Sequence, residues 1–318
     1  MILYILLPCF NAEATIGRAI ESVLPQLSEE IKLLIINDWS SDMSEDCIFS
    51  YMKSSKYIEY IKQKNKWICR ALWFWIDYLL NKELWTECFV ARLDSDDEYT
   101  STGAIDLLNC IKKTWWKYNC YIAWILDNKK NQLTKFYKQW YIKNSMINRN
   151  IASYVDSVCS IIKLSVYQNK KYSYNNIPAR AGDWIPSMRI QRDFGFYLTN
   201  VFFYKVHLIP NSLSRRLITK DYAKVALETN LILLNEFLLN DVDINKTDIW
   251  NKCLIISRYY AVIGKYKLAY YYLKLGIKNN PKNILYIWVA LTCFLPNGYK
   301  IVNFFVEKFL FQKNKDLW

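Results

Sequence analysis

Short apolar runs alternate with amphipathic stretches through the first 125 residues or so of the chain. Runs of this kind predict buried strands, here Ile2–Leu7, Lys32–Ile36, Tyr57–Ile61 and Cys88–Leu93. The intervening stretches predict helices over Thr15–Leu24, from Asp42 to about Lys53, and over Ile68–Leu80. Strands that alternate with helices of about 10–15 residues indicate parallel βαβ units. We therefore expect an α/β fold with a mostly parallel sheet flanked by helices.

Two of these helices carry further local patterns. The apolar face of the first consists of Ile16, Ala19, Ile20, Val23 and Leu24. Asp42 and Glu45 have the spacing of a capping box, in which each side chain accepts a hydrogen bond from the other residue's backbone N–H. This pair predicts where the second helix begins.

The pattern changes twice further along the chain. From about 126 to 218 it breaks into short β-like runs, and from Thr219 it is wholly helical. Within the helical part, Gly264-Lys265-Tyr266, Ala269 and Asn280-Pro281 match a tetratricopeptide-type helical hairpin. We expect one domain over residues 1–218 and a helical C-terminal region over 219–318.

Polar residues follow each predicted strand. They are Pro8–Glu13 after the first strand, Asn37–Asp42 after the second, Asn65–Arg70 after the third and Asp94–Asp97 after the fourth. In open parallel sheets, ligands bind beyond the carboxyl ends of the strands. These residues are therefore the first candidates for a functional site.

The acidic group after the fourth strand is the most informative of these. Asp94, Asp96 and Asp97 repel one another unless a cation lies among them. Oxygen ligands suit Mg²⁺ or Mn²⁺, ions that also hold substrate phosphates. An isolated Asp-x-Asp motif is more often a solvated loop or a helix cap. Its position after a buried strand, with Asp38 after another, favours a metal site instead.

Residues 3–100 resemble the family 2 inverting glycosyltransferases of the GT-A fold. The resemblance is carried by Leu7-Pro8-Cys9-Phe10-Asn11-Ala12-Glu13, Ile16-Gly17-Arg18-Ala19-Ile20-Glu21-Ser22-Val23-Leu24, Asn37-Asp38-Trp39-Ser40-Ser41-Asp42 and Ala91-Arg92-Leu93-Asp94-Ser95-Asp96-Asp97. It implies a Rossmann-like sheet with a nucleotide-sugar half over 1–125, an acceptor half over 126–218 and the helical extension after them.

The resemblance also implies roles for individual residues. It assigns Asp38 and Arg70 to the nucleoside and its base, and Asp94 and Asp96 to the donor and its metal-bound diphosphate. Asp97 is an alternative ligand and otherwise a donor contact. The other expected substrate contacts are Pro8, Asn11 and Glu13.

The candidate catalytic base is Asp183 in Gly182-Asp183-Trp184, at the place of the second member of a family acidic pair. Gly182 departs from that pair, and a structural alternative is that Asp183 caps the helix expected to run to about Gln191. The run Gln191-Arg192-Asp193-Phe194-Gly195 does not match the Gln-x-x-Arg-Trp motif of processive members, so we expect transfer of a single sugar. His207 lies in an apolar run, where a packed strand residue is favoured over a metal ligand.

The expected reaction is one displacement at the anomeric carbon of a nucleotide-diphosphate-sugar, with a UDP-sugar as one candidate. Mn²⁺ or Mg²⁺ on Asp94 and Asp96 would neutralise the leaving diphosphate, and Asp183 would deprotonate the acceptor hydroxyl. The expected acceptor is a glycan or a lipid-linked molecule used for cell-surface polysaccharide.

Charge and composition bear on partners and location. The net charge of +13 indicates an anionic partner without naming it. Nine cysteines without a C-x-x-C pair indicate reduced thiols in the cytoplasm, and no apolar run is long enough to span a bilayer. We expect a cytoplasmic protein with peripheral contact to an anionic membrane at its inner face, and no nucleic-acid partner. A solvated basic helix face explains the same charges.

Two rival functions remain at this stage. A nucleotidyltransferase would share the sheet and the metal, although Pro8-Cys9-Phe10-Asn11 is not a Gly-rich phosphate loop. A non-catalytic basic module that binds membrane or RNA would explain the charge but not the three aspartates.

Tryptophan is abundant where glycine is expected. The chain has 7 Gly and 13 Trp, and Trp39, Trp67, Trp75 and Trp85 each occupy a position where the family has Gly. Trp39 lies in a strand-to-helix turn in which a positive φ is expected, and Trp67 is placed in a turn of the same type. Our hypothesis is that these residues are glycines encoded by UGA and translated with the wrong code. The alternative is a genuine Trp-rich family member.

Overall fold

The structure is a computed structural model that describes residues 1–64, 67–82, 84, 87–127, 140–142, 160–173, 177, 183, 185–207, 219–239, 246–279 and 284–305. The chain forms two compact units, Met1–Leu208 and Ile209–Trp318. The boundary expected at 218 stays a prediction, because residues 208–218 lie outside the described ranges.

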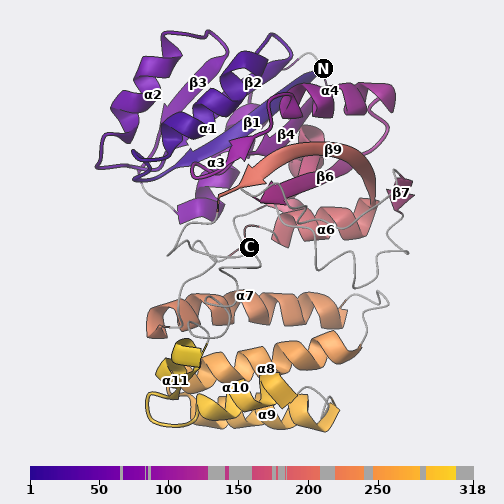
Figure 1. Cartoon of the computed structure of the whole chain (residues 1–318). Helices are drawn as coiled ribbons and strands as arrows, with labels where there is room; N and C mark the ends of the chain where they lie inside the picture. The colour runs from indigo at the N-terminus through magenta and orange to yellow at the C-terminus, as the bar shows by residue number, and fades with distance from the viewer. Residues whose placement is uncertain are drawn as a thin grey trace. The chain divides into compact units, whose positions relative to one another are not determined.

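Within the described residues, one nine-stranded sheet organises the first unit (Figure 1). Its strands are β1 (Ile2–Cys9), β2 (Ile31–Asn37), β3 (Ile58–Lys62), β4 (Cys88–Arg92), β5 (Glu98–Tyr99), β6 (Cys120–Asp127), β7 (Trp140–Ile142), β8 (Ser160–Lys163) and β9 (Phe196–Val206). Their order is β3-β2-β1-β4-β8-β6-β9-β5, with β7 paired to β9. The four strands expected from the sequence are parallel neighbours, and β8 adds an antiparallel strand beside β4.

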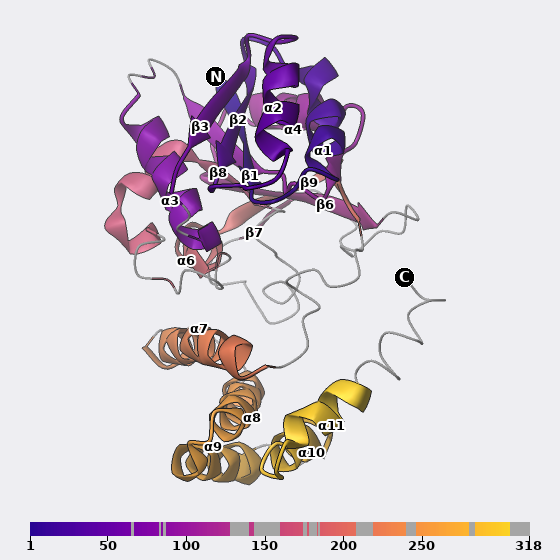
Figure 2. The ribbon, with the colours of Figure 1, turned by 90° about the vertical axis from the view of Figure 1, so that its left-hand side faces the viewer.

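Helices cover both faces of this sheet. They are α1 (Ile16–Val23), α2 (Ser44–Met52), α3 (Trp67–Leu80), α4 (Gly103–Lys113) and α6 (Ile185–Phe194). Helices α1, α2 and α4 lie on one face, and α3 and α6 lie on the other (Figure 2). The expected α/β class with a mostly parallel, helix-flanked sheet is confirmed.

Local sequence patterns predicted the buried face of the first helix correctly but the cap of the second helix incorrectly. In α1 the residues Ile16, Ala19, Ile20 and Val23 are buried, as the apolar face predicts, while Leu24 begins a half-buried 3-10 turn. The predicted capping box of α2 is wrong, because Glu45 instead accepts hydrogen bonds from Tyr60 Oη and Lys62 Nζ. A cation on the neighbouring strand attracts this carboxylate more strongly than a backbone N–H does.

The second unit is helical, with α7 (Lys220–Leu239), α8 (Lys246–Val262), α9 (Tyr266–Asn279), α10 (Ile284–Thr292) and α11 (Gly298–Phe305). Its core gathers around α8, where Cys253 and Ile256 pack with Ala223 of α7 and Ala269 of α9. Helices α8 and α9 form a hairpin whose turn contains Gly264 at φ 80°. Its tetratricopeptide character stays a prediction. Across the described residues, no helix has both the length and the apolarity that crossing a bilayer requires.

Several tryptophans occupy unusual positions. Trp39, Trp115 and Trp116 have φ values of 70°, 53° and 57°, in the left-handed region that favours glycine. The positive φ expected at Trp39 is thereby confirmed. Trp75 lies in α3 and is fully buried, and its indole Nε1 has no hydrogen-bond partner among the described residues. The turn expected at Trp67 is wrong, because this residue begins helix α3. The side chain of Trp67 and all of Trp85 lie outside the described part of the chain.

Candidate active site at the carboxyl ends of the parallel strands

The turns after β1 and β2 hold each other in place. Pro8 lies in β1 in register with Ile36 of β2, which brings the two following turns side by side. Asn11 has a φ of 48°, and its Oδ1 accepts a hydrogen bond from Ser41 N at 2.9 Å. Glu13 Oε2 accepts one from Met43 N at 2.9 Å. These predicted substrate contacts therefore also order the edge on which a nucleotide would lie.

Asp38 is a buried acidic residue on this edge. Its side chain is buried, its Oδ1 accepts a hydrogen bond from Gln63 Nε2 at 2.8 Å, and its backbone N–H donates to Cys9 O at 2.8 Å. The next residue, Trp39, is exposed, and Lys62 Nζ lies 5.7 Å from the centre of its ring. Arg70 lies in the first turns of α3, but its side chain is outside the described part of the structure.

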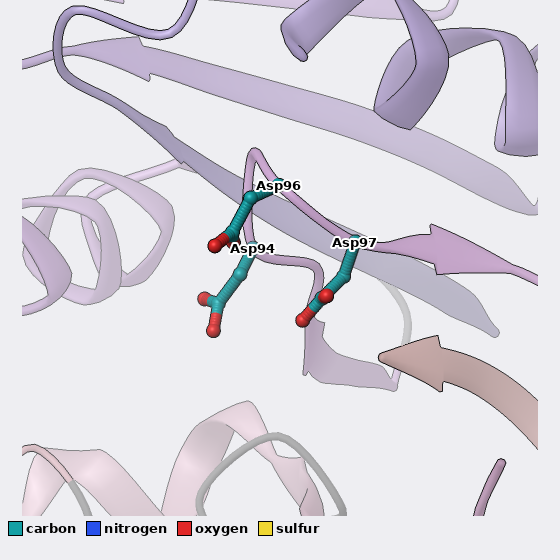
Figure 3. Close-up of side chains that lie close together, drawn as sticks. All are labelled: Asp94, Asp96 and Asp97. Atoms are coloured by element: carbon teal, nitrogen blue, oxygen red, sulfur yellow. The ribbon is translucent and has the colours of Figure 1, made fainter. Parts of the chain in front are cut away.

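The three aspartates that follow β4 lie together. Each of Asp94, Asp96 and Asp97 offers an oxygen within 4.8 Å of the others, and they extend from the loop between β4 and β5 (Figure 3). The backbone N–H of Asp97 donates to Asp94 O at 3.1 Å, so the loop folds back on itself. This turn brings the carboxylates together.

Asp97 differs from the other two because it is buried and anchored to β9. Its Oδ2 accepts a hydrogen bond from Tyr204 Oη at 2.9 Å, and its Oδ1 accepts one from His207 N at 2.7 Å. Burial, and then the charge of Asp94, raise the pKa of Asp97 to about 7. The surrounding groups therefore do not fully compensate the charged form of this buried carboxyl. An oxygen-ligated divalent cation fits this donor set.

Arg92 connects the acidic loop to the candidate base. Its Nε donates to Asp94 Oδ1 at 2.5 Å, and its Nη1 forms an ion pair with Asp183 Oδ2. Burial disfavours the charged guanidinium, but Asp94 and Asp183 together hold the pKa of Arg92 well above its ordinary value. No local sequence pattern indicates this role for Arg92, because its second partner is 91 residues away along the chain.

A second cationic group holds the backbone of the same loop. Arg18 of α1 donates from Nη2 to Asp96 O at 2.5 Å, and its Nε lies 3.3 Å from Glu98 Oε1. Glu98 also contacts Lys205 and His207. The packed-strand interpretation of His207 is wrong: the residue follows the end of β9, and its imidazole Nε2 lies 3.0 Å from Glu98 Oε1.

A parallel sheet edge with a buried aspartate after one strand and a carboxylate cluster after another is the arrangement of GT-A-type enzymes, which handle nucleotide-sugars. The family model for glycosyl transferase family 2 matches residues 4–169. The chain belongs to this family and is a glycosyltransferase. The two rival functions are thereby set aside.

Relatives extend the likeness over nearly the whole chain. A GalNAc(5)-diNAcBac-PP-undecaprenol beta-1,3-glucosyltransferase of Campylobacter jejuni is 25% identical, with 93% of this chain and 94% of the relative covered. The structure of S. aureus TarS 1–349 in complex with UDP-GlcNAc is similar at a TM-score of 0.61 and 12% identity, covering 97% of this chain and 92% of that one. The complex of TarS 1–349 with UDP is similar at a TM-score of 0.58. These structures support the GT-A fold.

Proposed function

We propose that this glycosyltransferase transfers one sugar from a nucleotide-diphosphate-sugar to a lipid-linked glycan, with inversion and with a divalent metal ion. The observation that carries the proposal is the link between two sites. Arg92 contacts Asp94 of the carboxylate cluster and Asp183, the candidate base, with one guanidinium group. In this proposal, the shared guanidinium would hold the donor-side and acceptor-side carboxylates in a fixed relation to each other.

On the donor side, Asp94 and Asp96 would hold the metal and the diphosphate, and Asp38 with Arg70 would hold the nucleoside. A divalent ion bound there supplies neutralisation of charge on the leaving diphosphate. Asp97 completes the cluster, and its bonds to Tyr204 and His207 keep the loop against β9. Arg18 holds the loop from the other side, because its guanidinium donates a hydrogen bond to the Asp96 carbonyl. Pro8, Asn11 and Glu13 shape the adjoining edge.

On the acceptor side, Asp183 would remove the proton from the attacking hydroxyl while the hydroxyl oxygen bonds to the anomeric carbon. A single displacement of this kind inverts the anomeric configuration and needs no covalent enzyme intermediate. The ion pair with Arg92 restrains the Asp183 carboxylate before the acceptor arrives. Orientation in advance lowers the entropic part of the barrier.

The relatives guide the choice of substrates. The Campylobacter jejuni enzyme is named for an undecaprenol-diphosphate-linked glycan, and TarS binds UDP-GlcNAc and UDP. We therefore propose a UDP-sugar donor, a lipid-linked acceptor at the inner face of the membrane, and a role in surface polysaccharide synthesis. Mn²⁺ and Mg²⁺ are the candidate ions.

Glycine at position 39 is a further part of the proposal. Trp39 is exposed beside Asp38 with a φ of 70°, so its indole stands at the edge where the nucleoside would bind. A glycine would relieve the backbone and open that edge. Sequencing of the gene tests this directly, because the hypothesis requires TGA at codons 39, 67, 75 and 85.

A panel of nucleotide-sugars, measured by thermal shift with and without Mn²⁺ or Mg²⁺, tests the donor proposal. A donor at about 100 times its Kd stabilises the folded state by about 2.7 kcal/mol, so one nucleotide should stand out, and only with metal. Asp96→Asn should abolish the metal-dependent part of the stabilisation by the donor. Glu29→Gln is the matched control, because Glu29 is exposed near the start of β2, at the opposite edge of the sheet. Equal stabilisation of wild type and Asp96→Asn would contradict the assigned metal site.

A further inference from the structure

Helix α9 presents an exposed face rich in tyrosine and lysine. Its members are Lys267, Tyr270, Tyr271, Lys274 and Lys278, all exposed and spaced three or four residues apart or adjacent. The opposite face of the helix carries Ala269 and Leu273, which are buried. The exposed face is thus defined by helical spacing and is not a chance scatter of surface residues.

Helix α10 and the residues after it expose an apolar stripe next to α9. Trp288, Leu291 and Leu295 are 41%, 49% and 54% exposed, at positions i, i+3 and i+7. On the inner side, Ala290 packs with Leu273 of α9 and Leu254 of α8 in one cluster. The rings of Tyr266 and Phe294 lie 6.1 Å apart, so the two helices are neighbours. We refer to the exposed residues of both helices as the α9–α10 surface.

The charge around this surface has one sign. From Ile249 to Val306 the sequence contains no Asp or Glu. The basic residues of this stretch are Lys252, Arg258, Lys265, Lys267, Lys274, Lys278, Lys282 and Lys300. Helix α7, where acidic residues do occur, packs on α8, and α9 lies on the other side of α8 (Figures 1 and 2). The α9–α10 surface therefore attracts anions and repels cations.

We propose that the α9–α10 surface is a docking surface for a lipid bilayer with anionic headgroups. Trp, Leu and Tyr side chains beside lysines are the composition of helices that lie in the membrane interface. Tyrosine and tryptophan rings place an apolar body toward acyl chains and a polar tip toward water, and lysines extend their ammonium groups to the headgroups. Charge complementarity selects anionic lipid over a neutral surface.

The proposal goes beyond the transfer reaction and does not require it. Docking would serve a lipid-linked acceptor, because membrane binding would confine the enzyme to the plane in which that acceptor diffuses. Donor binding measured on the same variants separates the two ideas. A variant that loses vesicle binding but keeps metal-dependent stabilisation by the donor would be defective in the docking surface alone.

Flotation of the full chain with phosphatidylcholine vesicles, with and without about one third phosphatidylglycerol, tests the proposal. Wild type should float only with the anionic vesicles, and salt should release it because the charge contribution is screened. The triple change Lys267→Gln, Lys274→Gln and Lys278→Gln removes charges that each contribute about fivefold, so the partition coefficient should fall by about a hundredfold. The control is Lys53→Gln, Lys56→Gln and Lys113→Gln, which removes the same charge from exposed positions of the first unit.

A second variant addresses the apolar part of the surface. Leu291→Ser with Leu295→Ser changes exposed side chains, so the fold should be retained, as circular dichroism would verify. Binding to anionic vesicles at low salt should fall several-fold, because the change removes apolar area and leaves the charge unaltered. Equal flotation of the lysine triple and its control would overturn the proposal. So would lysine-dependent binding to RNA without vesicle binding, or a concentration-dependent dimer in sedimentation that the same changes dissociate.

Discussion

Replacement of Trp115 by glycine should stabilise the protein, although the change removes a large aromatic side chain. Trp115 follows α4, and its backbone N–H donates to Lys112 O at 3.0 Å while that of Trp116 donates to Ile111 O at 3.3 Å. These two bonds define a Schellman motif with Trp115 at the position that is usually glycine. Its φ of 53° is left-handed, and its side chain is 89% exposed.

The chain contains the same motif with glycine in place. After α8, Gly264 N donates to Ala261 O at 3.0 Å and Lys265 N donates to Tyr260 O at 2.9 Å, with Gly264 at φ 80°. The two helix ends therefore make the same bonds with different residues. The comparison isolates what a side chain costs at this backbone position.

The magnitude follows from two terms. A left-handed conformation costs a non-glycine residue about 1–2 kcal/mol. Glycine avoids this cost, but it also makes the unfolded chain more flexible, which destabilises the folded state by about 0.4–1 kcal/mol. The exposed indole contributes little burial, so Trp115→Gly should raise the free energy of unfolding by about 0.5–1 kcal/mol. For a unit of this size that raises Tm by about 2–3 °C.

Thermal and urea unfolding of Trp115→Gly and Trp115→Ala would measure the effect. Alanine removes the ring but keeps the Cβ, so glycine should exceed alanine by about 1 kcal/mol. Gly264→Ala is the reverse change. A Cβ there meets no atom of the described residues within 4 Å, so only the φ cost remains, about 1 kcal/mol of destabilisation. Alanine as stable as glycine at 115 would refute the reasoning, because the backbone would then carry no strain.

Three further predictions concern the active site and its support. Arg92→Lys cannot bridge Asp94 and Asp183 in the same way, so turnover should fall about 10–100-fold with little change in donor affinity; an unchanged turnover number would argue against a positioning role. Removal of divalent ions by EDTA should eliminate donor-dependent stabilisation in wild type and change nothing in Asp96→Asn, as a thermal shift would record. Gly103→Ala should destabilise the first unit by about 1–3 kcal/mol, because the new Cβ would lie 2.6 Å from Phe203 O of β9; a neutral result in urea unfolding would mean that α4 and β9 can move apart.

The sequence is sufficient to predict those features that depend on residues close together along the chain. The strand and helix pattern of the first 100 residues follows from apolar periodicity, and the Asp94–Asp97 turn brings its carboxylates together over a few residues. Contacts between distant segments were not predictable in this way. The Tyr204–Asp97 bond spans 107 residues, and the Arg92–Asp183 pair joins strand β4 to a residue whose role came only from the resemblance.

The same distinction applies to the errors. Asp42 and Glu45 have the spacing of a capping box, yet Lys62 of β3 attracts the Glu45 carboxylate at 2.5 Å. His207 looked like a packed strand residue because its neighbours are apolar, and only the pairing of β5 with β9 brings it to Glu98. In both cases a charged partner from another strand determined the outcome, and no local pattern reports such a partner.

Trp75 distinguishes the two explanations of the tryptophans better than the turn positions do. At Trp39 and Trp115 both explanations predict that glycine is tolerated, since these side chains are exposed on a left-handed backbone. Trp75 is fully buried in α3, and no described residue pairs with its indole Nε1. If tryptophan is the natural residue, Trp75→Gly leaves a cavity in the core and should cost about 3–5 kcal/mol, as loss of a buried aromatic side chain does. If glycine is natural, the helix evolved to pack closely there, and the change should stabilise the protein by relieving overpacking and the unpaired donor, about 1–3 kcal/mol each. Urea unfolding of Trp75→Gly thus gives opposite signs for the two explanations, and a loss of several kcal/mol would end the glycine hypothesis at this position.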